Sequence, residues 1–108
     1  MKVKDLTDKL SYECLVSNGN EEELLDAYCS DLLSDVMGNA PEDSVLITIQ
    51  AHKNTVAVAS LAGIHALLIC NNRPTPDDML KSAGEEGISV FRTKDNQFNA
   101  SWKVHELL

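Results

Sequence analysis

Val45-Leu46-Ile47-Thr48-Ile49 is the stretch of the chain that decides the fold class. It is rich in β-branched residues and almost continuously apolar, as expected for a strand that is covered by helices on both faces. Such strands occur in parallel sheets, in which the chain returns to the next strand through a helix. The stretch therefore predicts an α/β domain, and the segments around it are expected to supply further strands and crossover helices.

The residues that follow this strand alternate between helical and strand patterns. Asn54 is a suitable cap for the first of these helices, and Thr75-Pro76-Asp77-Asp78 combines a Thr cap, an early Pro and an acidic first turn. Short connections between such elements imply parallel strands with right-handed crossovers. The expected elements are a helix over 54–62, a strand over 65–70, a helix over 75–87, a strand over 88–91 and a helix over 95–107.

The N-terminal part of the chain predicts two shorter strands and two helices. The expected elements are a helix over 2–10, a strand over 12–16, a strand over 26–29 and a helix that Ser30 or Asp31 caps and that ends at Gly38. With 108 residues the chain fits one domain, residues 1–108. The overall prediction is a single small α/β domain with a largely parallel sheet flanked by helices.

The charge is distributed unevenly along the chain, which carries a formal net charge of −8. Residues 1–44 hold 3 Lys and 11 Asp or Glu, a net of 3 − 11 = −8, whereas residues 45–108 hold 6 of each sign, a net of 0. Contacts with the phosphates of DNA or RNA need clustered Lys or Arg, and so does binding to an anionic membrane surface. The acidic half therefore predicts that neither nucleic acid nor a membrane is a partner.

Three cysteines, Cys14, Cys29 and Cys70, are present without a Cys-x-x-Cys pair. An odd number at this spacing is neither a disulfide framework nor a zinc site. Each lies in an apolar stretch, so we expect buried, reduced thiols and a cytoplasmic location. The first residues lack an apolar signal segment, and the longest apolar run, residues 56–70, is shorter than a bilayer span.

Two polar clusters follow the two predicted buried strands, 45–49 and 65–70, at the carboxyl ends where open parallel sheets bind their ligands. Together they offer amides, a guanidinium, an ammonium and an imidazole, a set that suits a phosphate, a carboxylate or a small polar metabolite. The alternative is that these are ordinary loops, because Asn is common in turns and caps. The candidate ligand-binding residues are Gln50, His52, Lys53, Asn54, Asn71, Asn72 and Arg73, with Asp31 at the start of the preceding helix.

Residue patterns of common enzymes are missing from the chain. It has no Gly-x-x-x-x-Gly-Lys loop, no Gly-x-Gly-x-x-Gly loop and no Gly-x-Ser-x-Gly elbow. His52, His65 and His105 lack the spacing of a metal site, and His65, which opens a strand, is expected to be a hydrogen-bonded structural residue. Two carboxylates, Asp31 and Asp35, are too few ligands for a cation site. The preferred role of Asp31 is a favourable electrostatic interaction with the start of the helix. We therefore expect a non-catalytic protein without a metal or cofactor.

Three separated segments resemble the DRTGG domain family, and they agree with it in order and spacing over nearly the whole chain. They are Tyr28-Cys29-Ser30-Asp31-Leu32-Leu33-Ser34-Asp35-Val36-Met37, then Ile47-Thr48-Ile49-Gln50-Ala51-His52-Lys53-Asn54, and a strand followed by Asn71-Asn72-Arg73-Pro74 and an acidic helix start. The signature itself departs from the family. At the positions of Asp-Arg-Thr-Gly-Gly the chain reads Glu23-Leu24-Leu25-Asp26-Ala27, so any anion contact made by the signature loop is lost.

This resemblance implies a regulatory module with a fold like the N-terminal domain of HPr kinase, which is not the catalytic domain of that enzyme. DRTGG domains occur beside CBS domains in some pyrophosphatases and inside some phosphotransacetylases. Stand-alone versions are associated with iron-only hydrogenase systems. The resemblance thus implies a homodimer and a role in regulating hydrogenase or central metabolism.

Three functions from different classes follow from these observations. The first is a dimeric, non-catalytic module that senses a small anionic or nucleotide-like ligand at the polar clusters. The second is a protein–protein interaction or scaffold subunit that uses its acidic face from Glu21 to Asp35 and binds no small molecule. The third is an enzyme such as a phosphatase or kinase. We favour the first.

Overall fold

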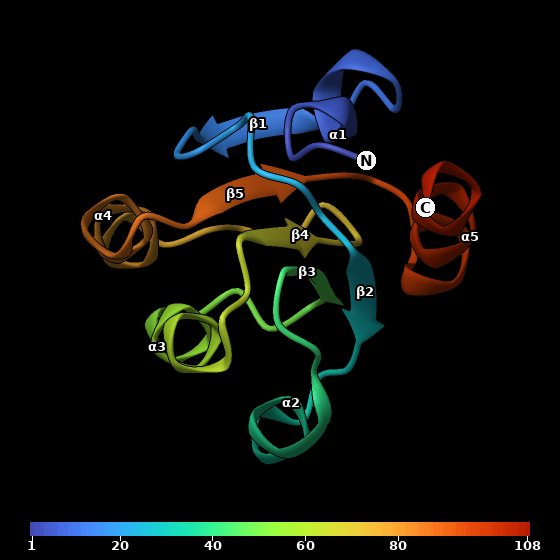
Figure 1. Cartoon of the computed structure of the whole chain (residues 1–108). Helices are drawn as coiled ribbons and strands as arrows, with labels where there is room; N and C mark the ends of the chain where they lie inside the picture. The colour runs from blue at the N-terminus through green and yellow to red at the C-terminus, as the bar shows by residue number, and fades with distance from the viewer.

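The computed structural model describes all residues, 1–108, and builds them around one five-stranded sheet (Figure 1). The strand order across the sheet is β1-β5-β4-β3-β2. Strands β2 to β5 are parallel to their neighbours, whereas β1 is antiparallel to β5. The strands are β1 (Glu13–Val16), β2 (Asp26–Cys29), β3 (Ser44–Thr48), β4 (Ala66–Ile69) and β5 (Ser89–Arg92).

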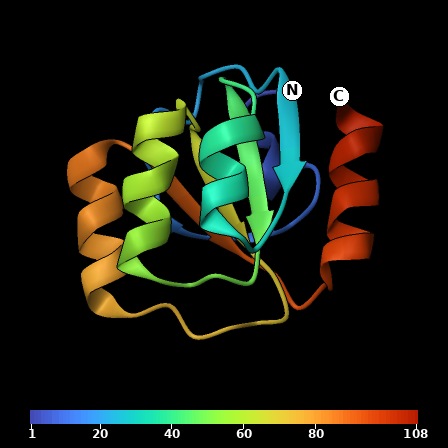
Figure 2. The same ribbon diagram turned by 90° about the horizontal axis from the view of Figure 1, so that it is seen from below.

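Five helices cover the two faces of this sheet. Three of them lie on one face and the other two lie on the opposite face, with α5 standing apart beside β2 (Figures 1 and 2). None of these helices combines the length and the apolar character that crossing a membrane requires. The first face carries α2 (Leu33–Asn39), α3 (Lys53–Ala62) and α4 (Asp77–Glu86), and the second carries α1 (Asp5–Asp8) and α5 (Gln97–Leu107).

Each face of the sheet has its own hydrophobic core because side chains alternate along a strand. On β3, Val45 and Ile47 point into the core beneath α1 and α5, whereas Leu46 points into the core beneath α2, α3 and α4. All five residues of β3 are buried, and so are all four of β4. The central strands are therefore sandwiched between two layers of helices, as their continuous apolar sequences predict.

The α/β class and the largely parallel sheet are thus confirmed, but several predicted helix starts are wrong. Asn54 does not cap α3: His52 holds that position, and its Nδ1 accepts a hydrogen bond from the Asn54 amide at 3.1 Å. Neither Ser30 nor Asp31 caps α2, which begins at Leu33 after Leu32. Helix α4 begins at Asp77, and no side chain caps it. Residue propensities locate the end of a helix in the sequence only to within one or two residues.

The prediction of three buried cysteines is wrong for two of them. Cys14 and Cys29 are exposed, and only Cys70 is buried. Both exposed thiols lie on the outer strands β1 and β2, where one side of the strand has no neighbour. Burial raises the pKa of Cys70 to about 12, so its thiol stays protonated and unreactive at neutral pH.

Candidate functional site

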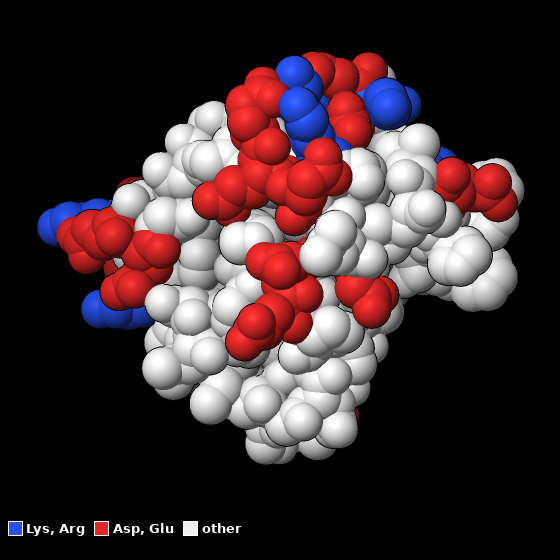
Figure 3. Space-filling view, viewed as in Figure 1, with Lys and Arg blue, Asp and Glu red and all other residues white.

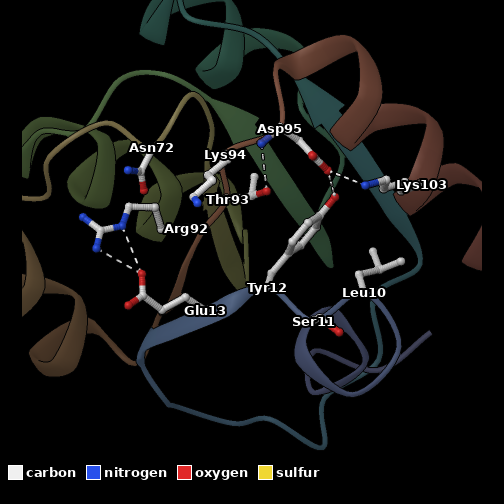
Figure 4. Close-up of a pocket in the computed structure, with 10 residues that line it drawn as sticks. All are labelled: Leu10, Ser11, Tyr12, Glu13, Asn72, Arg92, Thr93, Lys94, Asp95 and Lys103. Carbon is white, nitrogen blue, oxygen red and sulfur yellow. Dashed lines mark hydrogen bonds and ion pairs between the residues drawn. The ribbon is translucent and has the colours of Figure 1, made fainter.

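A polar cavity of ≈ 340 Å³ lies between β1, the end of β5 and the loop that follows β4 (Figure 4). This position is at the carboxyl ends of the parallel strands, where open α/β sheets bind ligands. Helix α5 supplies one side chain, and the segment before β1 supplies three. The lining residues are Leu10, Ser11, Tyr12, Glu13, Asn72, Arg92, Thr93, Lys94, Asp95 and Lys103.

Positive charge exceeds negative charge in this cavity, although the chain as a whole is acidic. Arg92, Lys94 and Lys103 face two carboxylates, Glu13 and Asp95, which gives 3 − 2 = +1. The Arg92 guanidinium contacts Glu13 Oε1 through Nη2 at 3.0 Å and through Nε at 3.1 Å. Lys94 is exposed and is drawn without a partner in Figure 4. The cavity therefore offers one cation that is free to meet an anion.

Asp95 organises the wall of the cavity next to α5. Its Oδ2 accepts hydrogen bonds from the Tyr12 hydroxyl at 2.9 Å and from the Lys103 ammonium at 2.8 Å. The Lys103 ammonium and the Tyr12 hydroxyl lower the pKa of the Asp95 carboxyl below its usual value. Burial, and then the hydrogen bond to Asp95, raise the pKa of Tyr12 above its usual value. The pair thus stays fixed as a carboxylate and a neutral phenol at physiological pH.

These two pKa shifts predict losses of stability at opposite ends of the pH scale. Because the folded pKa of Asp95 is lowered, its contribution is present above the unfolded value of about 3.9 and is lost as pH falls through the folded value. Because the folded pKa of Tyr12 is raised, its contribution is present below about 10 and is lost as pH rises. Urea unfolding of the wild type and of Tyr12→Phe should show a constant stability difference from about pH 6 to 9 that shrinks above about pH 10. A difference that stays constant up to pH 11 would contradict this.

The loop after β4 brings one predicted ligand residue into the cavity. Asn71 and Asn72 adopt left-handed backbone conformations, with φ of 59° and 50°. Their amides donate to the carbonyls of Asp95 at 2.9 Å and Thr93 at 2.8 Å, and these bonds join this loop to the end of β5. Asn72 lines the cavity, whereas Arg73 is exposed at the next position of the loop. The second predicted cluster thus lies at the cavity and along its rim.

Asp31, also predicted as a ligand residue, is engaged in holding the structure together. Its Oδ1 accepts hydrogen bonds from Thr48 Oγ1 at 2.8 Å, the Ile49 amide at 2.9 Å and Gln97 Nε2 at 2.9 Å. The Gln50 side-chain amide also donates to the Asp31 carbonyl at 3.0 Å. This carboxylate therefore ties together the ends of β2 and β3 and the start of α5. The prediction that Asp31 interacts with the start of the helix is wrong. α2 begins only at Leu33, and the Asp31 carboxylate is engaged by these three donors.

The remaining predicted residues lie on the other side of the sheet. His52 caps α3 through its contact with the Asn54 amide, and the Asn54 side chain is exposed. Lys53 lines a separate cavity of ≈ 240 Å³ with Asp78, Lys81, Ser82 and Glu85, between α3 and α4. The structure therefore does not gather the predicted residues into one pocket. It divides them between the Figure 4 cavity, the Asp31 hydrogen bonds and the groove beside α3.

His65 is confirmed as a hydrogen-bonded structural histidine. Its Nδ1 lies 2.7 Å from Glu22 Oε2 and its Nε2 lies 2.7 Å from Asp43 Oδ1. It thereby joins the loop between β1 and β2 to the start of β3 at the amino-terminal edge of the parallel strands. Figure 3 shows that acidic side chains gather across this face. No three His, Cys, Asp or Glu side chains are arranged to hold a metal ion.

Of the ten residues that line the cavity, only Asn72 was predicted from the sequence. The missed residues that carry its positive charge or take part in the Asp95 hydrogen bonds are Tyr12, Arg92, Lys94, Asp95 and Lys103. Three of them end or follow β5, so the rule that ligands bind at the carboxyl ends of strands, applied to that third strand, would have found them. Tyr12 and Lys103 had no such signal. They reach the cavity only because β1 pairs with β5 and α5 packs back over the sheet, which are both long-range contacts.

Comparison with known proteins supports the fold. The structure matches the CBS and DRTGG regulatory region of Clostridium perfringens pyrophosphatase, solved in complex with its activator diadenosine tetraphosphate, with a TM-score of 0.73 and 15% sequence identity. The match covers 94% of this chain and 44% of that chain, so the present chain spans less than half of the structure that it resembles. No family model and no curated protein matches the sequence. The resemblance to DRTGG domains is thus confirmed at the level of the fold.

Proposed function

We propose that this protein is a non-catalytic regulatory module, working as a homodimer, that binds a small anionic or nucleotide-like ligand in the cavity of Figure 4. The observation that carries this proposal is a net positive cavity in a chain of net charge −8. Its volume of ≈ 340 Å³ lies at the lower end of the usual range for ligand sites, roughly 300–1,000 Å³. The cavity fits a phosphate group with an attached sugar better than a whole dinucleotide.

The arrangement of polar groups around Lys94 supports an anionic ligand. Lys94 supplies the free charge, the Asn72 side-chain amide offers a neutral donor, and Lys103 is held by Asp95. A charged hydrogen bond from Lys94 to an anionic ligand contributes about 1.5–3 kcal/mol. The matched pyrophosphatase region binds a nucleotide polyphosphate, which makes nucleotides the first ligand class to test.

A thermal-shift screen followed by calorimetry tests the proposal, with mono- and dinucleoside polyphosphates and inorganic pyrophosphate as the probes. A ligand that binds only the folded state raises the melting temperature. For any nucleotide hit, Lys94→Ala should weaken binding by about 10-fold or more, since it removes one charged hydrogen bond. Arg73→Ala tests whether the residue at the rim of the cavity contributes to ligand binding. Lys81→Ala is the matched control, because Lys81 is an exposed lysine on α4 that lines the other groove.

Two results would overturn this assignment. Binding that survives Lys94→Ala and is lost in Lys53→Ala would move the site to the groove between α3 and α4. The absence of any hit with the folded protein would favour the scaffold function. That alternative is supported by the amino-terminal edge of the sheet, where Glu22, Glu23, Asp26, Glu42 and Asp43 lie close to the β1–β2 loop and the strand starts (Figure 3).

A further inference from the structure

The cavity of Figure 4 contains two ion pairs, and the pair between Glu13 and Arg92 leaves hydrogen-bonding capacity unused. In the other pair, the Asp95 carboxylate is held by Lys103 and also by the Tyr12 hydroxyl. Glu13 and Arg92 contact only each other, and Arg92 Nε and Nη2 both meet the same oxygen, Glu13 Oε1, at 3.1 and 3.0 Å. Glu13 Oε2 and the remaining N–H groups of Arg92 therefore have no partner within the protein.

The register of the sheet positions this pair at the cavity. Glu13 on β1 lies directly opposite Arg92 on β5, and opposite charges at such positions attract each other across two antiparallel strands. The Glu13 side chain is 56% exposed and the Arg92 side chain is 27% exposed, so solvent screens their attraction and the pair contributes little net stability. A ligand can therefore bind to both members of the pair without destabilising the fold.

The unused groups of the pair suit a ligand that carries both a phosphate and hydroxyl groups. Arginine has five N–H donors, and those that do not point at Glu13 can donate to a phosphate oxygen together with the Lys94 ammonium. Glu13 Oε2, as a carboxylate oxygen, can only accept a hydrogen bond, which a sugar hydroxyl donates. In dinucleotide sites an acidic side chain likewise binds a ribose hydroxyl, whereas an arginine accommodates a phosphate.

Charge limits how many phosphate groups the cavity can accept. Its net charge is +1, because Glu13 and Asp95 oppose three cationic side chains. A single phosphate ester carries roughly −1.5 to −2 charges at pH 7, and every further phosphate brings additional negative charge toward the two carboxylates. Like charges repel one another at such short range, and a repulsive element of this kind is a common source of specificity. The cavity is therefore better matched to one phosphate than to several.

We propose that Glu13 is a specificity-determining residue of this cavity and that it selects a sugar phosphate, free or as part of a nucleoside monophosphate, over polyphosphates. Glu13 Oε2 accepts a hydrogen bond from a sugar hydroxyl, while Arg92 and Lys94 bind the phosphate. This inference rests on the proposed function, since it requires an anion site in the cavity. It names the ligand class and the residue that distinguishes this class from other anions.

Titration calorimetry on the full chain measures the preference with ribose 5-phosphate, methyl phosphate and inorganic pyrophosphate as probes. Methyl phosphate carries one phosphate and no hydroxyl, so its comparison with ribose 5-phosphate reports on the hydroxyls. The wild type should bind ribose 5-phosphate at least about 10-fold more tightly than either of the others, the effect of one hydrogen bond to a charged group. Adenosine monophosphate distinguishes the two sources of the sugar phosphate: tighter binding than ribose 5-phosphate indicates a nucleotide, and weaker binding indicates a free sugar phosphate.

Glu13→Gln tests the role of the carboxylate, because it removes the charge and keeps the size of the side chain. Pyrophosphate should bind about 10-fold more tightly to this variant, since the repulsion is lost and Arg92 is released. The preference for ribose 5-phosphate over each of the other two probes should fall by about the same factor. Glu85→Gln is the matched control. It makes the same chemical change at an exposed glutamate in the groove between α3 and α4, and it should leave all three affinities unchanged.

The possible results separate a failure of this inference from a failure of the proposed function. If the wild type binds pyrophosphate at least as tightly as ribose 5-phosphate, and Lys94→Ala weakens both, the cavity is an anion site and the inference about Glu13 is overturned. Preferences that are the same in Glu13→Gln and in the wild type also overturn it. If no probe binds either protein, or if binding does not depend on Lys94, the anion site and the role of Glu13 are overturned together.

Discussion

Asp31→Ala is expected to destabilise the protein by about 3 kcal/mol, because hydrogen bonds to a charged group contribute about 1.5–3 kcal/mol each and are not fully additive. The Asp31 carboxylate receives three of them, from Thr48, Ile49 and Gln97. Its removal leaves the Ile49 amide and the buried Thr48 hydroxyl without that acceptor. It also detaches the start of α5 from the ends of β2 and β3. Urea unfolding followed by circular dichroism measures the loss.

Two comparisons make the Asp31 result specific. Asp31→Asn keeps the size of the side chain and one oxygen, so it should restore part of the lost stability. Asp77→Ala, in the exposed first turn of α4, should leave the unfolding midpoint close to that of the wild type. If Asp31→Ala unfolded at the wild-type urea concentration and instead lost binding of a ligand, the carboxylate would belong to a binding site as the sequence predicted.

Phe91→Ala should be at least as damaging, with a loss of about 3–5 kcal/mol, the usual cost of removing a buried aromatic ring. Phe91 lies on β5, is 1% exposed and is among the largest fully buried side chains of the core beneath α1 and α5. The chain supplies its own control, because it has only two phenylalanines and the other is exposed. Phe98→Ala should therefore change the stability of dilute protein by less than about 0.5 kcal/mol. Equal effects of the two substitutions would contradict the burial of Phe91.

The core of the fold was predictable from local sequence. β3 and β4 are runs of apolar residues bounded by turn residues, and Gly63 and Gly87 mark the ends of α3 and α4 in left-handed conformations, as expected from the sequence. The partner and direction of β1 were not predicted, because a short strand carries no information about which strand it will pair with. The exposure of Cys14 and Cys29 was missed for the same reason, since burial on an edge strand depends on its neighbours.

The candidate site was predictable only in part. The rule about strand ends identified Asn72, which lies in a loop after a central strand. It also selected Gln50 and His52, whose side chains make local hydrogen bonds: the Gln50 side-chain amide donates to the Asp31 carbonyl, and His52 caps α3. The same polar residue types bind ligands and cap helices, so the sequence alone does not distinguish the two roles and the contacts in the structure are needed.

The pairing of the first strand with the last also determines the order in which the chain can assemble as it is synthesised. Tyr12 and Asp95 are 83 residues apart in sequence, and β1 has no other strand beside it than β5. The β2–α2–β3 and β3–α3–β4 units need only nearby residues and can form while the C-terminal part is still being made. β1 leaves the ribosome before the other four strands and is incorporated last, so a nascent chain carries an unpaired β1 until β5 has been made.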